Sequence, residues 1–243
     1  MVRSLLVRGM VAGLVAGIIA FVFARLVGEP ALQGALSYED ALAAASGESG
    51  GVAPVSRGTQ SGIGLAVAFL VYGVALGGIL ALVHATVQGR VGALGVRGTA
   101  VVVALVGFVS AVLVPFLKYP ANPPASSIDG TIGTRTGSYV LLVVLSVALA
   151  AAAAVAARRL RTRLGWWNAV LAAAGGYMVV VGLVAVLLPA VAETPADFPA
   201  TVLYDFRLAS LGGHVVLWTV LALVFAELAS RSVRAATQRV TQA

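Results

Sequence analysis

Six long apolar runs lie along this chain of 243 residues, and they limit its fold more than any other feature. They cover residues 5–27, 63–87, 99–117, 139–157, 168–191 and 208–228. Each is close to the roughly 20 residues that a helix needs to cross the hydrocarbon core of a bilayer. Because they are apolar on all sides, they differ from amphipathic surface helices, which have a charged face. The sequence therefore predicts an all-α fold, a polytopic membrane helix bundle of six transmembrane helices in a single integral membrane domain over residues 1–243.

The composition agrees with this prediction and excludes several classes of protein. Hydrophobic residues make up 60% of the chain and charged residues only 10%, whereas soluble domains have about 45–50% and about 25%. A soluble domain of this length could not bury so much apolar surface while exposing so few charges. A soluble enzyme, a disordered chain and a coiled coil are therefore excluded. The chain also has no cysteine, so it has neither a disulfide framework nor a thiolate metal ligand.

The charges are distributed unevenly between the two sets of helix ends. Most of the basic residues lie at the N-terminus, in the short connections 88–98 and 158–167, and in the tail after residue 228. Every acidic residue except Glu227 lies at the opposite ends. Basic residues mark the cytoplasmic side, so we expect both termini in the cytoplasm and long outer loops over 28–62, 118–138 and 192–207. Long loops on a rigid scaffold often carry function, and we expect recognition on the outer face.

Small residues recur at helical spacing in the first two spans. Gly9, Gly13 and Gly17 are four residues apart, and so are Gly73 and Gly77. Such spacing lets helix backbones approach closely, and it would also suit an ion path between thin helices. We favour the packing interpretation, because these motifs occur in membrane proteins of every function.

The two histidines are the exceptions to the absence of acidic and basic residues from the middle of the spans. His214 lies about 9 Å below the outer start of the sixth span, at the helical rise of about 1.5 Å per residue. His84 is near the inner end of the second span, so the two should not share a metal ion unless a helix bends, as the pair Gly212 and Gly213 would allow. His214 is the better candidate for a divalent cation, because imidazole is a common ligand. A structural hydrogen bond is the alternative for both.

Outer-face oxygen atoms provide further candidate ligands, because carboxylates attract a cation and amide or backbone oxygens ligate one. Glu29 would alternatively pair with Arg25 at helical spacing, and Ser37 with Asp40 resembles the N-cap of a short helix that Gly47 ends. The candidate metal ligands are His214, Glu29, Glu39, Asn122, Glu193, Asp197 and Asp205.

A proline-rich segment over residues 115–124 is predicted to be extended, with carbonyl groups that no helix uses. Those carbonyls suit a cation, although Lys118 opposes a simple cation site, and a rigid outer lid is the alternative interpretation. The residues assigned to gating or to partner contact are Lys118, Tyr119, Pro120, Pro123, Pro124, Arg135 and Arg207.

Three of these segments resemble the CbtA family of probable cobalt transporter subunits. They are Phe23–Pro30, Phe116–Pro124 with its Lys-Tyr-Pro-x-Asn-Pro-Pro motif, and Pro195–Ser210. The resemblance implies a multi-pass protein of the bacterial inner (plasma) membrane that takes part in cobalt uptake. It also implies a small single-span partner, a CbtB-like subunit with histidines. Family members are often described with five spans, whereas the charge pattern here requires an even number, and we predict six.

Together these features predict the membrane subunit of a divalent metal-cation uptake system, with the outer acidic and proline-rich loops forming the entry. The resemblance implies that the cation is cobalt. The alternative is a non-transporting accessory or assembly subunit of a larger complex. No nucleotide-binding motif and no nucleophile–base pair are apparent, so we predict no enzyme activity. Co²⁺ or another divalent cation would be the substrate, and no tightly bound cofactor is expected. The expected partners are the bilayer and other membrane chains, an oligomer is compatible with the sequence, and no nucleic acid is expected.

Overall fold

The computed structural model describes residues 2–47, 55–90, 94–126, 130, 132–191 and 194–241, with side chains to residue 231, and it confirms the all-α prediction. Within these residues, five helices are long and apolar enough to cross a membrane: Val2–Ser46, Arg57–Val87, Val96–Lys118, Ile132–Leu187 and Ala200–Arg231. This pattern is that of a multi-pass membrane protein. The chain forms two compact units. Unit 1 comprises Met1–Leu105, Pro123–Ala125 and Phe198–Ala243, and unit 2 comprises Val106–Asn122 and Ser126–Asp197.

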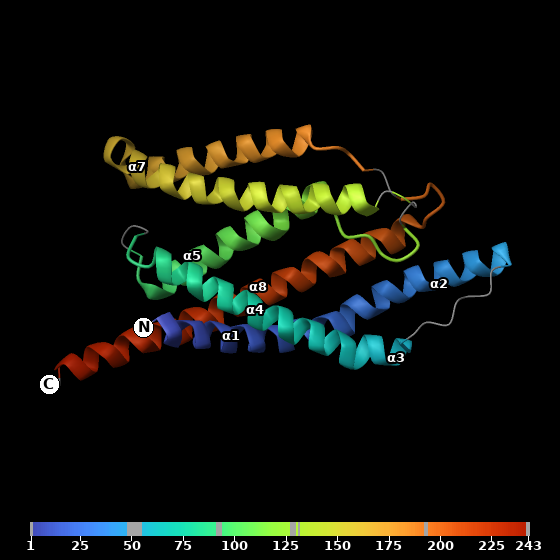
Figure 1. Cartoon of the computed structure of the whole chain (residues 1–243), viewed down its shortest axis with the longest axis horizontal. Coiled ribbons are helices and arrows are strands. Elements are labelled where there is room, and N and C mark those ends of the chain that lie inside the picture. The colour runs from blue at the N-terminus through green and yellow to red at the C-terminus, as the bar shows by residue number, and fades with distance from the viewer. Residues whose placement is uncertain are drawn as a thin grey trace. The chain divides into compact units, whose positions relative to one another are not determined.

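Unit 1 is built on three helices, α1 (Val2–Phe23), α4 (Leu65–Val87) and α8 (Ala200–Thr241) (Figure 1). The closest approach is between α1 and α4. Gly9 faces Gly77, and Gly13 faces Gly73. A Cβ atom built on any of these four glycines would lie under 3.0 Å from the carbonyl oxygen of the glycine that it faces. The two glycine motifs therefore interlock backbone to backbone, which confirms the packing interpretation.

The end of unit 1 that carries the N-terminus is held by polar contacts between α8 and its neighbours. Arg97, on α5 (Val96–Phe108), forms an ion pair with Glu227, and Arg231 binds the same carboxylate at 2.9 Å. The Arg8 guanidinium donates a hydrogen bond of 2.6 Å to the carbonyl of Leu228. Side chains thus join α1 and α5 to α8 near their basic ends.

The first helix is longer than the sequence predicted. It passes through a π-helical turn, η1 (Ala24–Gly28), and continues without a break as α2 (Glu29–Ser46). Ser37 is therefore not an N-cap, and its hydroxyl donates to the carbonyl of Gln33 at 2.9 Å. The predicted stop at Gly47 is confirmed, since this glycine caps α2 with a φ of 71°. The predicted outer loop over 28–62 thus begins with five turns of helix.

Two further π-helical turns occur among the described residues. Before α4, the short helix α3 (Arg57–Thr59) leads into η2 (Gln60–Gly64). After α5, η3 (Val109–Leu113) leads into α6 (Val114–Lys118). Both η1 and η3 end two residues before a proline, Pro30 and Pro115. Because proline removes a hydrogen bond from a helix, a widened turn lets the helix continue past it.

Unit 2 consists mainly of α7 (Ile132–Leu187), which the structure folds back on itself (Figure 1). The helix is interrupted only at Gly165, whose φ of 73° and ψ of 168° are non-helical. Its two arms are joined by a hydrogen bond of 2.8 Å between the hydroxyls of Ser146 and Tyr177 and by a cluster of Leu142, Val181 and Tyr119. The predicted connection 158–167 is therefore helical apart from one glycine, because its arginines and leucines are good helix formers.

The last helix also differs from the prediction. α8 begins at Ala200, inside the predicted connection 192–207, and runs as one helix past Gly212 and Gly213. The bend expected there is absent from this described stretch. A Cβ atom on Gly212 would lie 2.9 Å from Cζ of Phe23, so this glycine makes room for an aromatic ring on α1.

Candidate functional site

A buried carboxylate in unit 1 is the candidate ligand with the best-defined surroundings. Glu29 is 7% exposed at the start of α2, directly after η1. Its Oε2 atom lies 3.1 Å from Nη2 of Arg57, which stands at the start of α3 and is partly exposed. Nη1 of Arg57 also donates to Oε1 of Gln60 at 3.1 Å. The predicted partner of Glu29, Arg25, is therefore replaced by an arginine that is distant in the sequence.

The other acidic candidates of unit 1 are exposed and separate from Glu29. Glu39 lies ten residues farther along α2, about 15 Å at the helical rise, and Asp205 lies on the outside of α8. The segment between Glu29 and Glu39 is fixed against the start of α8. The rings of Tyr38 and Phe198 pack edge to face at 4.9 Å, and Gly34 lies against Val202.

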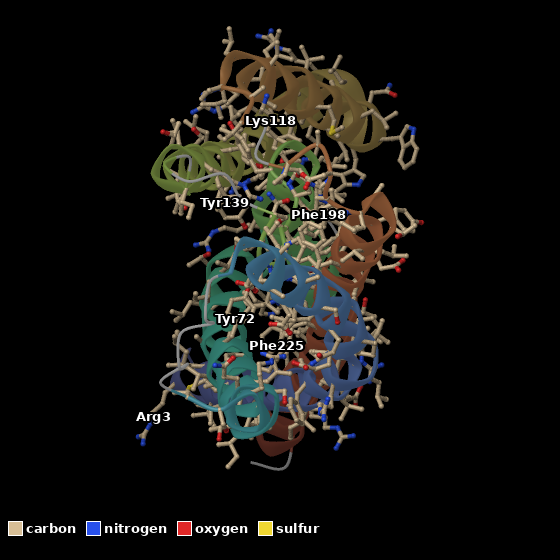
Figure 2. The ribbon with its side chains drawn as sticks, turned by 90° about the vertical axis from the view of Figure 1, so that its right-hand side faces the viewer. Arg3, Tyr72, Lys118, Tyr139, Phe198 and Phe225 are labelled. Atoms are coloured by element: carbon tan, nitrogen blue, oxygen red, sulfur yellow. The ribbon has the colours of Figure 1, made fainter. Side chains whose placement is uncertain are left out.

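The two histidines of unit 1 lie at different levels, as expected. His84 is buried, and its ring stands edge-on to that of Phe225 with centroids 5.2 Å apart. Figure 2 shows Phe225 inside the helices of this unit, whereas Arg3 points away from them. His214 is half-buried and lies eleven residues before Phe225 on the same helix, a separation of about 16 Å. No described residue donates to or accepts from Nδ1 of His84.

Residues 115–122 of the proline-rich segment supply the candidate site of unit 2. Residues 114–118 are helical, because Pro115 stands in the first turn of α6, where its missing N–H is not needed. The non-helical part begins at Tyr119, whose hydroxyl donates to the carbonyl of Pro189 at 2.7 Å while its ring is buried. The Lys118 ammonium lies 5.8 Å from the centre of that ring.

One carbonyl of this segment is already in use. The guanidinium of Arg135, near the start of α7, donates a hydrogen bond to the carbonyl oxygen of Pro120. No helical bond among the described residues uses this carbonyl, as predicted, but a side chain does. The extended conformation predicted for residues 115–118 is wrong, because these residues continue the helix. The rest of the segment varies in exposure: Pro123 is buried, Asn122 is half-buried and Pro124 is exposed.

The remaining candidates belong to different parts of the chain. Asp197 is exposed at the end of unit 2, Arg207 is half-buried on α8, and Glu193 lies outside the described residues. In the part of the chain that the structure describes, no three histidine, aspartate or glutamate side chains come close enough to hold a metal ion. Two oxygen atoms of the predicted entry are each held by an arginine: Arg57 holds the Glu29 carboxylate, and Arg135 holds the Pro120 carbonyl.

Sequence reasoning missed Arg57 and Pro189. Arg57 carried a signal, because it is one of the few basic residues on the acidic side of the charge pattern. Pro189 carried no signal, because its carbonyl comes within reach of the Tyr119 hydroxyl only when α7 has folded back.

The family model described as "Probable cobalt transporter subunit (CbtA)" matches residues 2–230, which is nearly the whole chain. No curated protein and no solved structure matches the chain.

Proposed function

The chain belongs to the CbtA family of probable cobalt transporter subunits, and from this premise we propose that it takes a divalent cation, with Co²⁺ as the substrate, into the cell through an entry on its outer face. The entry comprises Glu29, the four other acidic candidates and the proline-rich segment. Glu39, Asp197, Asp205 and Glu193 attract the cation toward it. The description of the family as transporter subunits agrees with a protein that is not an enzyme.

One observation supports this proposal above the others: in each unit, a guanidinium holds an oxygen atom of the predicted entry. Arg57 holds the Glu29 carboxylate, and Arg135 holds the Pro120 carbonyl. A guanidinium is a monovalent cation with directed hydrogen bonds. An incoming divalent cation competes for the same oxygen atoms. We therefore assign Arg57 and Arg135 as occupants of the entry that a cation displaces.

The proposed orientation places both termini in the cytoplasm of a bacterium, with six spans through the inner membrane as one membrane domain. The bend of α7 supports six spans, because it divides a 56-residue helix into two apolar arms. The basic residues at the N-terminus and at this bend support the orientation. Labelling of single engineered cysteines would test it: residues 40 and 122 should react from outside, and residue 161 only from inside.

The proposed ligand set is rich in oxygen and completed by a second chain. Co²⁺ accepts oxygen and imidazole ligands, and His214 and Asn122 are the other candidates in this chain. The word "subunit" in the family description supports a partner. A single-span chain with histidines, of the CbtB type, would supply the missing imidazoles.

Uptake of Co²⁺ by cells that produce the chain, alone and with a candidate single-span subunit, tests the proposal. Glu29→Gln should lower uptake by about tenfold or more, the factor that corresponds to about 1.4 kcal/mol of binding free energy. Asp40→Asn is the matched control, because this carboxylate is exposed on the same helix, and uptake should stay within about twofold of the unchanged chain. No stimulated uptake in any combination would contradict the proposal and favour a non-transporting accessory subunit.

A further inference from the structure

Four arginines without acidic partners gather where α7 folds back. Arg158, Arg159, Arg161 and Arg163 occupy the last two turns of its first arm, and all four are exposed. Their guanidinium groups form no ion pair with any residue that the structure describes. Arg57, Arg97 and Arg231 elsewhere each hold a carboxylate. The charge at the bend of α7 is therefore available to a partner outside the chain.

The arginines form two neighbouring pairs on the helix surface. Arg159 and Arg163 are four residues apart, and Arg158 and Arg161 are three apart, so each pair lies on one face. Like charges at this spacing repel each other when nothing lies between them. An anion with two charged groups would relieve the repulsion in both pairs at once.

Aromatic residues follow the arginines directly. Gly165 ends the first arm, and Trp166 and Trp167 begin the second, exposed by 39% and 71%. Exposed tryptophans are typical of the zone between hydrocarbon and water, where the ring lies among lipid headgroups. An indole pair beside a basic cluster therefore indicates a lipid surface rather than a soluble partner.

The depth of the cluster agrees with the headgroup layer. If the apolar stretch that ends at residue 157 crosses the hydrocarbon core, residues 158–164 extend about 10 Å beyond it, at about 1.5 Å per residue. The headgroup region on each side is about 5–8 Å thick. Arginine side chains are long and flexible, so all four guanidiniums reach the phosphates.

We propose that the bend of α7, defined by Arg158, Arg159, Arg161, Arg163 and the two tryptophans, binds an anionic phospholipid with two phosphodiester groups, such as diphosphatidylglycerol. The guanidinium pairs donate hydrogen bonds to the two phosphates, and the indoles lie against the glycerol and upper acyl regions. This inference requires only that α7 crosses the bilayer, and it does not require that the chain transports a cation.

The test measures lipid binding to the full-length chain purified in a neutral detergent. Native mass spectrometry counts bound diphosphatidylglycerol, with phosphatidylcholine as the neutral reference. The unchanged chain should bind the anionic lipid saturably, and Arg161→Gln with Arg163→Gln should weaken binding by about tenfold or more. The matched control replaces Arg3 and Arg90 by glutamine, which removes the same charge elsewhere and should change affinity less than twofold.

Two further measurements distinguish a specific lipid site from a general effect of charge. Replacing the four arginines by lysine keeps the charge and should retain most of the binding, and raising NaCl should weaken binding to the unchanged chain, because the contact is electrostatic. An equal loss in the Arg3 and Arg90 control, or no preference for the anionic lipid, would overturn the proposal. Competition by inorganic phosphate or ATP at equal concentration would show a site for free phosphate, and would overturn the lipid assignment too.

Discussion

The carbonyl oxygen of Gly73 on α4 faces the bare Cα of Gly13 on α1 so closely that no side chain fits between them. Gly9 and Gly77 repeat the arrangement one turn away. In a membrane, where lipid removes the hydrophobic drive for helices to associate, this close contact is the main attraction between the two helices. Four glycines therefore set the distance between α1 and α4, on which the packing of the rest of unit 1 depends.

Replacing Gly13 by alanine should weaken this contact strongly. The added methyl group would lie under 3.0 Å from backbone atoms of Gly73, so α1 and α4 must separate. We expect the free energy of unfolding to fall by about 2 kcal/mol, within the range for overpacked sites. Gly175→Ala is the matched control, because nothing lies within 4 Å of its Cβ position. The two variants are compared by thermal unfolding in detergent, and equal effects would contradict the packing assignment.

Removing Arg57 should cost more than removing both partners of its ion pair. Arg57→Gln leaves the buried carboxylate of Glu29 without its cation, at an expected cost of about 1–3 kcal/mol. In the double variant with Glu29→Gln, no unpaired charge stays buried, and most of the loss should be recovered. A double-mutant cycle on unfolding free energies measures this coupling, and simple additivity of the two changes would argue against the pair.

The hydroxyl of Tyr119 should stabilise unit 2 through its bond to the Pro189 carbonyl. Tyr119→Phe removes this donor and leaves a backbone acceptor unsatisfied, which should cost about 1–2 kcal/mol. Tyr139→Phe is the control, because that ring is 38% exposed and its change should stay within about 0.5 kcal/mol. Proteolysis rates at the 119–126 segment, together with thermal unfolding, report the difference.

The bend of α7 should depend on the absence of a side chain at Gly165. Its φ of 73° and ψ of 168° lie in a region that is essentially restricted to glycine. Because other residues lose about 1–3 kcal/mol there, Gly165→Ala should destabilise unit 2 by that amount. Gly182→Ala in the second arm is the control, and it should be neutral or slightly stabilising, because alanine favours a helix. Thermal unfolding of both variants checks this, and a stabilised Gly165→Ala chain would contradict the bend.

The buried ring of His84 should tolerate an apolar replacement better than truncation. No described residue bonds to its Nδ1 atom, so His84→Leu removes an unsatisfied group while it fills similar space and should cost less than about 1 kcal/mol. His84→Ala leaves a cavity beside Phe225 and should cost about 2–4 kcal/mol. The order of the two melting temperatures is the measurement, and the reverse order would indicate that the imidazole has a polar partner.

The helices made of continuous apolar residues could be predicted from the sequence, but the residues at which several of them begin and end could not. Five of the six runs lie wholly in helices, whereas the fifth, predicted to end at residue 191, leaves its helix at Leu187. The glycine spacing on α1 and α4 correctly indicated close packing. The outer loop predicted from residue 28, however, begins as a helix, because a π-helical turn lets the helix continue past Pro30. Such turns depend on the neighbouring helices and leave no simple pattern in the sequence.

The sequence indicated which residue types form the candidate site, but not which side chains bind one another there. Glu29 and the proline-rich segment could be selected because carboxylates and carbonyls suit a cation. Their partners, Arg57 and Arg135, are 28 and 15 residues away, and no periodicity connects them. Long-range contacts of this kind depend on how the connections fold over the helix ends, which local propensity does not determine.

The three π-helical turns have a consequence for how this chain is compared with its relatives. Each turn holds one residue more than an α-helical turn, so it behaves as a single-residue insertion that the helix has absorbed. A relative that lacks the extra residue would present every later side chain rotated by about 100° about the helix axis. The gap in such an alignment belongs in η1 or η3. An alignment that places it inside α2 or α6 would assign Glu29, Glu39 or Lys118 to the wrong face of its helix.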